Sequence, residues 1–234
     1  MLEQLLEKGF EKLNIGIDGK AIERYRVFCD RLEETNKVMN LTAITGEEDI
    51  ARLHFLDCAA ILNTEDFKGK TVIDVGTGAG FPGLALKIAE PDMNLVLLDS
   101  LDKRIGFLRD TCRALELDGV ECVHARAEEQ PEGFREHFEI AVSRAVARLN
   151  VLCEMCLPYV KKGGCFIAMK GPDFDEELNE AKHAIAELGA AVEKTVRYTV
   201  PGTDIVHSAI VIRKTGPTPN KYPRRWAQIK KQPL

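Results

Sequence analysis

The chain has 234 residues, of which 45% are hydrophobic and 29% are charged, an ordinary globular composition. Its longest apolar runs, such as residues 165–169, fall far short of the roughly 20 residues that span a bilayer, so no membrane association is expected. The N-terminus is acidic and lacks the basic region and apolar block of a secretory signal. Seven cysteines, an odd number, are scattered through predicted core elements, which indicates a reducing, cytoplasmic location rather than a disulfide framework.

The net charge of −5 conceals an uneven distribution. Residues 205–234 contain no Asp or Glu and seven Lys or Arg residues, which leaves −12 for the preceding 204 residues. An acidic body with a basic tail predicts that a polyanionic partner binds through the tail. Trp226 in this tail could anchor it to the body or stack on a base, and the sequence leaves both possibilities open.

Hydrophobic periodicity predicts helices first and an alternation of strands and helices afterwards. Helices are expected over residues 2–13 and 22–32, and Thr45 with Glu48 predicts a capping box that begins a third helix, continuing to residue 61. Strands are expected at residues 72–75, 95–98, 120–124, 138–143, 164–170, 192–200 and 206–213, with helices at 103–115, 145–157 and 174–188. A Pro201-Gly202 turn between the last two strands makes them antiparallel.

This order of elements predicts an α/β fold with a seven-stranded, mostly parallel sheet, an antiparallel last strand and additional N-terminal helices. We divide the chain into an N-terminal helical extension (residues 1–65), an α/β domain (66–214) and a basic C-terminal tail (215–234). The four prolines after residue 216 predict an irregular tail.

The strongest motif is the glycine-rich segment of residues 74–83, directly after the first strand. Glycines let the backbone turn sharply and approach a ligand closely. The spacing Gly78-x-Gly80-x-x-Gly83 by itself satisfies the dinucleotide fingerprint, in which Asp99 would hold a ribose hydroxyl of NAD.

Asp74 favours a methyl donor over NAD. It lies inside the first strand, where a dehydrogenase normally has an apolar residue, and an acid before Gly76-x-Gly78-x-Gly80 is typical of methyltransferases that use S-adenosylmethionine. A pyrophosphate would also prefer a helix N-terminus without a neighbouring carboxylate. The closing antiparallel hairpin fits the same fold, and Asp99 would equally hold the ribose of S-adenosylmethionine.

Segments spread over nearly the whole chain carry a more specific pattern. They are Asn40-Leu41-Thr42, His54-Phe55-Leu56-Asp57, residues 74–82, Asp99-Ser100-Leu101-x-Lys103-Arg104, Arg126-Ala127-Glu128, Ser143-Arg144-Ala145-Val146-Ala147 and Lys221-Tyr222-Pro223-Arg224. With them the chain resembles the RsmG family (glucose-inhibited division protein B), bacterial small-subunit ribosomal RNA guanine-N7 methyltransferases of the Rossmann-like class I fold. Many members carry Gly-Thr-Pro after the tail arginines, where this chain has residues 226–229.

The resemblance implies that donor-binding residues lie at the ends of the first four strands. They are Gly76, Gly78, Phe81, Asp99, Ser100, Ala127, Glu128 and Arg144. Asp99 ends the second strand, where its carboxylate can accept from both ribose hydroxyls, and Arg144 follows the fourth, at the edge where α/β folds bind ligands. No metal site is expected: Cys153 and Cys156 lie in a predicted helix without a second pair, which favours buried thiols over zinc.

Each candidate also has a structural alternative. Asp99 could cap the following helix, Glu128 could be a solvated charge, and Arg144 could pair with a surface carboxylate. His54 is interpreted as a structural histidine with satisfied hydrogen bonds.

The function implied by the resemblance is methyl transfer from S-adenosylmethionine to N7 of a guanine in small-subunit ribosomal RNA or in an assembling small subunit. Guanine N7 has no proton to lose, so we expect no catalytic base, and Arg144 is the candidate for orienting the base or the donor. Two alternatives are a methyltransferase acting on a protein or small molecule and a non-catalytic RNA-binding protein that senses the donor. The basic tail disfavours the first, and the intact glycine loop with Asp99 and Arg144 disfavours the second. We expect a monomer.

Overall fold

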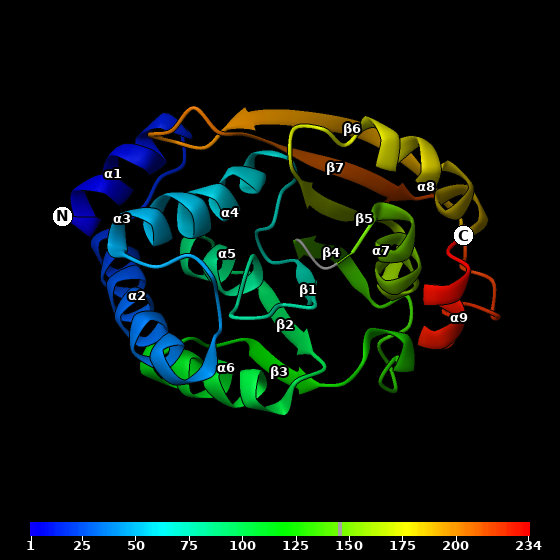
Figure 1. Cartoon of the computed structure of the whole chain (residues 1–234), viewed down its shortest axis with the longest axis horizontal. Helices are drawn as coiled ribbons and strands as arrows, with labels where there is room; N and C mark the ends of the chain where they lie inside the picture. Colours follow the sequence, from blue (N-terminus) through cyan, green and yellow to red (C-terminus); the bar gives the residue numbers. More distant parts are fainter. Residues whose placement is uncertain (145–146) are drawn as a thin grey trace.

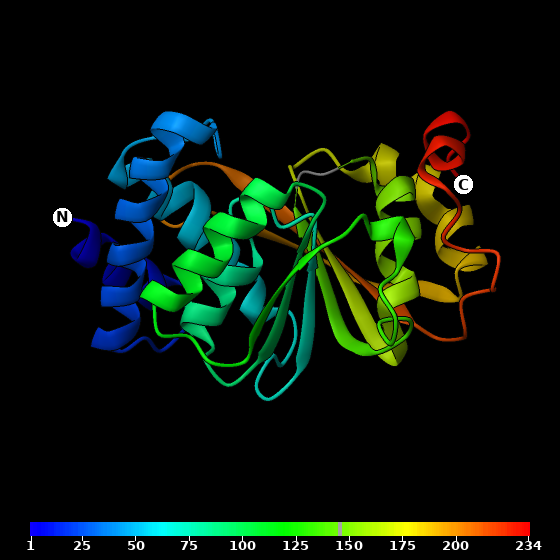
Figure 2. The ribbon, with the colours of Figure 1, turned by 90° about the horizontal axis from the view of Figure 1, so that it is seen from below.

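One central sheet with helices on both faces forms the body of the protein (Figures 1 and 2). The computed structural model describes residues 1–144 and 147–234. The strands are β1 (Thr71–Val75), β2 (Asn94–Asp99), β3 (Val120–His124), β4 (Phe138–Arg144), β5 (Val160–Lys170), β6 (Ala190–Thr199) and β7 (Val206–Lys214). Their order is β3-β2-β1-β4-β5-β7-β6; β1 to β5 are parallel to one another, and β7 is antiparallel to both β5 and β6. The predicted mostly parallel, seven-stranded sheet is confirmed.

The helices confirm most of the predicted order. They are α1 (Leu2–Lys12), α2 (Gly19–Met39), α3 (Glu47–Ile50), η1 (Ala51–Leu56), α4 (Asp57–Ala59), η2 (Ala60–Asn63), α5 (Gly83–Ala89), α6 (Asp102–Ala114), η3 (Ala127–Glu129), α7 (Leu149–Cys156), η4 (Leu157–Tyr159), α8 (Asp175–Glu187) and α9 (Trp226–Lys231). The helix expected from residue 145 begins at Leu149, and the first two residues of that prediction lie outside the described residues. Along the described chain, no helix combines the length and the apolar character needed to cross a membrane.

Alternating side chains of the strands build two separate cores. On one face, Val72 and Leu97 pack with the N-terminal helices, α5 and α6. On the other face, Ile73 and Leu98 pack with α7 and α8. Figure 2 shows these two helical layers on opposite sides of the sheet. Because successive side chains of a strand point to opposite faces, apolar residues at consecutive positions let helices pack on both faces of the sheet.

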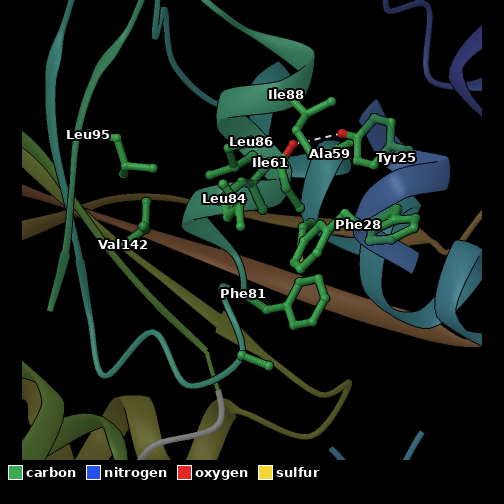
Figure 3. Close-up of a cluster of buried hydrophobic side chains, with 14 of the residues drawn as sticks. Tyr25, Phe28, Ala59, Ile61, Phe81, Leu84, Leu86, Ile88, Leu95 and Val142 are labelled. Carbon is green, nitrogen blue, oxygen red and sulfur yellow. Dashed lines mark hydrogen bonds between the residues drawn. The ribbon is translucent and has the colours of Figure 1, made fainter. Parts of the chain in front are cut away.

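The N-terminal helices are joined to the glycine-rich segment by aromatic packing. Tyr25 on α2 is fully buried and its hydroxyl donates to the carbonyl oxygen of Ala85 on α5 at 2.7 Å. The ring of Phe28 stacks on Phe81 with a centroid separation of 5.3 Å (Figure 3). Phe81 thereby connects the helical layer to the loop that follows β1.

The predicted capping box at Thr45 and Glu48 is wrong. Gly46 is the N-cap of α3, with a φ of 86° that favours glycine, and no side chain caps this helix. Glu48 pairs instead with Arg52, one turn further along, at 2.7 Å. The helical segment then continues through a π-helical turn, η1.

The prediction of a wholly irregular tail is also wrong, because the tail contains α9. Ile229 of this helix is fully buried, and α9 packs against α7. Tyr222, which precedes the helix, is buried in the same core as α7 and α8. An apolar residue at the right position is enough to fold a short helix onto an existing surface, even next to several prolines.

Close packing of α5 against β1 and β2 requires glycine at position 83. A Cβ atom there would lie 2.7 Å from Cβ of Asp74 and 2.8 Å from Cδ2 of Leu97. Gly83→Ala should therefore destabilise the fold by about 1–3 kcal/mol in urea unfolding, the usual result of overpacking a core. Gly106 on α6 has open space around it, so Gly106→Ala should stabilise the fold by about 0.5–1 kcal/mol. Equal effects of the two substitutions would contradict this packing argument.

Candidate functional site

A cavity of about 600 Å³ lies at the carboxyl ends of β1 to β4, within the size range of small-molecule sites. All eight predicted donor-binding residues line it: Gly76, Gly78, Phe81, Asp99, Ser100, Ala127, Glu128 and Arg144. Sequence reasoning did not assign the other lining residues to the donor site: Leu41, Thr42, His54, Thr77, Ala79, Leu98, Arg104, Ala125, Arg126, Met155 and Trp226. The structure thus brings the predicted residues together and adds contributions from the N-terminal region and from α9.

The glycine loop turns beside the end of β2. The N–H groups of Gly76 and Thr77 both donate to the carbonyl oxygen of Leu98, at 2.8 and 3.1 Å. Gly76, Gly78 and Gly80 have φ values of 75°, 60° and 103°, which L side chains rarely adopt. Alternate glycines are therefore required by the path of the backbone, independently of any ligand.

Asp99 joins this loop to the start of α6. Its Oδ2 accepts from the N–H of Gly78 and its Oδ1 from the N–H of Leu101, both at 2.9 Å. The guanidinium of Arg104 lies 3.5 Å from Oδ2. Asp99 thus has part of the structural role considered for it, at the turn before α6. Each carboxylate oxygen can accept more than one hydrogen bond, so the buried side chain can also receive a ligand at the cavity.

Asp74 lies beneath the loop and is not one of the cavity-lining residues. Its Oδ2 accepts from the N–H of Gly83 at 2.7 Å, which holds the start of α5 against β1. Burial raises the pKa of Asp74 to about 7, against the opposing effect of this hydrogen bond. Its Oδ1 has no hydrogen-bond partner within residues 1–144 and 147–234. The acid that indicated a methyl donor in the sequence acts here as a support for the loop.

Arg144, at the end of β4, is held by a buried carboxylate rather than a surface one. Its Nη1 donates to Oδ2 of Asp57 at 3.1 Å and to the carbonyl oxygen of Leu53 at 3.0 Å. Asp57 is only 1% exposed, and its Oδ1 lies 3.0 Å from the hydroxyl of Tyr198 and 2.7 Å from Nδ1 of His207. The guanidinium is therefore fixed from the side of the helices and the β6–β7 hairpin.

His54 completes this arrangement as a neutral ring. Nδ1 lies 2.6 Å from Nη2 of Arg144, and Nε2 lies 2.9 Å from Oγ1 of Thr42. A guanidinium can only donate, so Nδ1 must accept and Nε2 must carry the proton. Burial, assisted by the charge of Arg144, lowers the pKa of His54 to about 3. The ring stacks on Phe81 at 4.1 Å with an interplanar angle of 7°. His54 is satisfied and buried, as interpreted, and its ring also lines the cavity.

The sequence did carry a signal for the missed residues Thr42, His54 and Asp57. They belong to two of the segments that resemble the RsmG family, residues 40–42 and 54–57. No spacing within these segments indicates that they meet Arg144, which lies 90 residues further along the chain than His54.

Most of the seven positive charges in residues 205–234 are paired within the protein. Four of them are neutralised by carboxylates of the body: Arg213 by Glu65 and Glu193, Lys214 by Glu136, Lys221 by Glu187 and Arg224 by Glu154. Arg225, Lys230 and Lys231 make no ion pair with any residue that the structure describes. The tail is thus a packed segment in which three of the exposed cations have no ion-pair partner among the described residues. Cys153 and Cys156 are both buried free thiols, as expected.

The two histidines at Arg144 and Asp57 should titrate very differently. The ring signals of His54 should not shift in NMR spectra between pH 8 and 5, because its folded pKa is about 3. His207 should protonate above the usual 6.5, since its hydrogen bond to Asp57 raises its pKa. Asp57→Asn should lower the pKa of His207.

These titrations have opposite effects on stability. His54 destabilises the fold as pH falls from 6.5 towards 3, because only the unfolded state then takes up a proton. His207 stabilises the fold below pH 6.5, and this contribution is lost as pH rises through its folded pKa. A His54 ring that protonates near pH 6.5 would refute the hydrogen-bond assignment.

Known proteins resemble this chain over its full length. Residues 21–205 match the family model described as GidB, rRNA small subunit methyltransferase G. Proteins named ribosomal RNA small subunit methyltransferase G are similar: that of Alkaliphilus oremlandii is 48% identical over 100% of this chain and 99% of its own length. That of Clostridium tetani is 44% identical over 98% of both chains.

Solved structures resemble the fold. A methyltransferase from Pyrococcus furiosus has a TM-score of 0.58 at 16% identity, covering 83% of this chain and 99% of that one. TYW2 from M. jannaschii, solved in complex with AdoMet, has a TM-score of 0.51 at 11% identity, covering 62% and 68%. The predicted class I methyltransferase fold is confirmed. The family model and the near full-length relatives show that the chain belongs to the rRNA small subunit methyltransferase G family.

Proposed function

We propose that this protein transfers the methyl group of S-adenosylmethionine to N7 of a guanine in small-subunit ribosomal RNA. The observation that carries the proposal is the convergence of the glycine loop, Asp99 and Arg144 on one cavity at the carboxyl edge of the sheet. Parallel α/β folds bind their ligands at this edge. The names of the relatives supply the class of substrate.

The residues present fit the donor. The loop after β1 exposes Gly78, around which a Cβ would meet nothing within 4 Å, so a ligand can approach the backbone. Asp99 places a carboxylate at the end of β2, where ribose hydroxyls can donate to it. Ala127 and Leu98 provide apolar walls suited to a purine. When bound, S-adenosylmethionine supplies a methyl group activated by an adjacent sulfonium.

The chemistry at N7 needs alignment rather than proton transfer. N7 of guanine is a lone-pair acceptor, with O6 as a second acceptor beside it. Three contacts orient the guanidinium of Arg144. Because a guanidinium only donates hydrogen bonds, it would donate to O6 and leave the lone pair of N7 free. His54 cannot act as a base through Nδ1, because that lone pair already accepts from Arg144. Positioning and exclusion of water then provide the rate enhancement.

The same chemistry restricts the form of the RNA. In an RNA duplex, N7 lies in a deep, narrow groove that side chains cannot read. We propose a guanine that is unpaired or turned out of its helix, in naked RNA or in an assembling subunit. Arg225 lines a hollow beside the site and is exposed, as are Lys230 and Lys231 of α9, so these three cations are available for phosphate contacts.

The direct test is mapping of methyl groups in the RNA. Small-subunit RNA from cells that lack this methylation is incubated with enzyme and S-adenosylmethionine, and then digested for mass mapping. One N7-methylated guanine is expected. Methyl transfer to another atom, or only to protein, would contradict the proposal.

Asp99→Ala should weaken donor binding by roughly 1.5–3 kcal/mol, or about 10- to 150-fold, through loss of charge-assisted hydrogen bonds. Calorimetry with S-adenosylhomocysteine measures this change. Asp102→Ala is the matched control, because Asp102 is nearby but 74% exposed. Similar losses in both variants would remove Asp99 from the donor site.

The chemical step should show no requirement for an ionised base near neutrality. Its single-turnover rate should therefore not fall as pH is lowered from 8 to 6, since N7 carries no proton. Asp74 titrates near pH 7 without touching the cavity, so Asp74→Asn is a control that removes this titration and should keep the same profile. A rate that falls tenfold per pH unit in both proteins would show that a base is essential.

A further inference from the structure

The C-terminal helix α9 forms one wall of the same cavity. Trp226, its first residue, lines the cavity and is 37% exposed. In Figures 1 and 2, α9 lies beside α7, on the face of the sheet opposite the N-terminal helices. A large aromatic ring at the rim of a ligand cavity is unusual for a solubility tail.

A buried ion pair sets the position of this helix. Glu154 on α7 is 0% exposed and accepts from the backbone N–H of Arg224 at 2.8 Å and from its guanidinium at 2.8 and 2.6 Å. Arg224 lies two residues before Trp226, and Glu154 directly precedes Met155, which also lines the cavity. Removing one member of such a buried pair leaves an uncompensated charge, so the pair holds α9 firmly against α7.

A second set of contacts fixes the segment that leads into α9. The guanidinium of Arg135 donates to the carbonyl oxygens of Thr218 and Tyr222, both at 2.8 Å. The hydroxyl of Tyr222 donates to Glu187 on α8 at 3.1 Å. Arg135 therefore holds the backbone before Pro223, and the Arg224–Glu154 pair holds it after Pro223. Together these contacts fix the position of Trp226.

The neighbours of Trp226 belong to one end of the cavity. Arg126, Ala127 and Glu128, which follow β3, line the cavity with it, and Arg126 and Glu128 also line an adjoining surface hollow with Trp226. Other lining residues come from elsewhere in the fold: the glycine loop with Phe81 follows β1, and His54 lies on η1. Asp99, the last residue of β2, lies between these two groups because β2 separates β3 from β1 in the sheet.

We propose that Trp226 packs against the purine of the bound donor, so that the C-terminal segment is part of the donor site. This inference rests on the proposed donor, S-adenosylmethionine. With the ribose at Asp99, the purine reaches the end of the cavity formed by Ala127, Met155 and Trp226. These residues offer apolar and aromatic surface, on which a flat base stacks well.

An RNA base is the competing occupant of Trp226. The donor is favoured because Trp226 shares its cavity with Ala127 and Met155, rather than standing alone on an open basic surface. The adjoining hollow is not a basic groove, because Glu128 and Glu129 offset the charges of Arg126 and Arg225 there.

Substitution of Trp226 tests the proposal without disturbing the buried pair. Trp226→Ala should weaken S-adenosylhomocysteine binding by roughly 5- to 150-fold, the usual effect of losing a stacked base. Trp226→Phe should restore most of the affinity, because it keeps a stacking face. Trp226 is the only tryptophan of the chain, so its fluorescence should change when S-adenosylhomocysteine binds.

Variants of the segment separate packing from the contact itself. Glu154→Gln, which weakens the hold on Arg224, should shift the emission of Trp226 towards that of an exposed indole and lower affinity for S-adenosylhomocysteine. Lys221→Ala breaks an exposed ion pair of the same segment and should change neither.

The outcomes distinguish this inference from the proposed function. Unchanged affinity in Trp226→Ala, with or without loss of RNA binding, would overturn the role of Trp226 while leaving the methyltransferase intact. Failure of the unaltered protein to bind S-adenosylhomocysteine would instead overturn the proposed function. If S-adenosylhomocysteine bound tightly without changing the fluorescence of Trp226, that would also place Trp226 away from the donor.

Discussion

The site depends on the hydrogen bonds and ion pairs that the buried carboxylate of Asp57 makes. A charge removed from water costs several kcal/mol unless it is paired and hydrogen-bonded, and Asp57 meets Arg144, Tyr198 and His207. These partners come from the end of β4 and from the β6–β7 hairpin, while Asp57 itself begins α4. One side chain thus ties three distant parts of the chain together, and Arg144 is in position before any ligand arrives.

This arrangement suits a reaction that requires alignment more than proton transfer. Arg144 keeps its charge and orientation, and His54 is kept neutral by burial and by that charge. Donors that are already oriented need no reorganisation during the reaction, which is where electrostatic preorganisation has its largest effect. The glycine loop serves the same end, since Asp74 and Asp99 hold its backbone from below and from the side.

Local sequence predicted the fold well and the site in part. Strand alternation, helical spacing and the required glycines are short-range properties, so β1 to β7 and the loop could be found, and resemblance supplied Ala127 and Arg144. The Asp57–His207 contact spans 150 residues, and no local pattern encodes it. Charge counting could not reveal the ion pairs of the tail, because Glu154 meets Arg224 only once α7 has formed and the tail has packed against it. The prediction of a capping box was wrong because the helix begins after Gly46, whose positive φ favours glycine, and not after Thr45.

The most direct test of the account is a crystal structure with S-adenosylhomocysteine bound. We expect the ligand in the cavity at the carboxyl ends of β1 to β4, with its ribose hydroxyls on Asp99 and with Arg144 still hydrogen-bonded to Asp57. A ligand bound elsewhere, or an Arg144 side chain that must leave Asp57 to admit it, would contradict a site preorganised by that carboxylate.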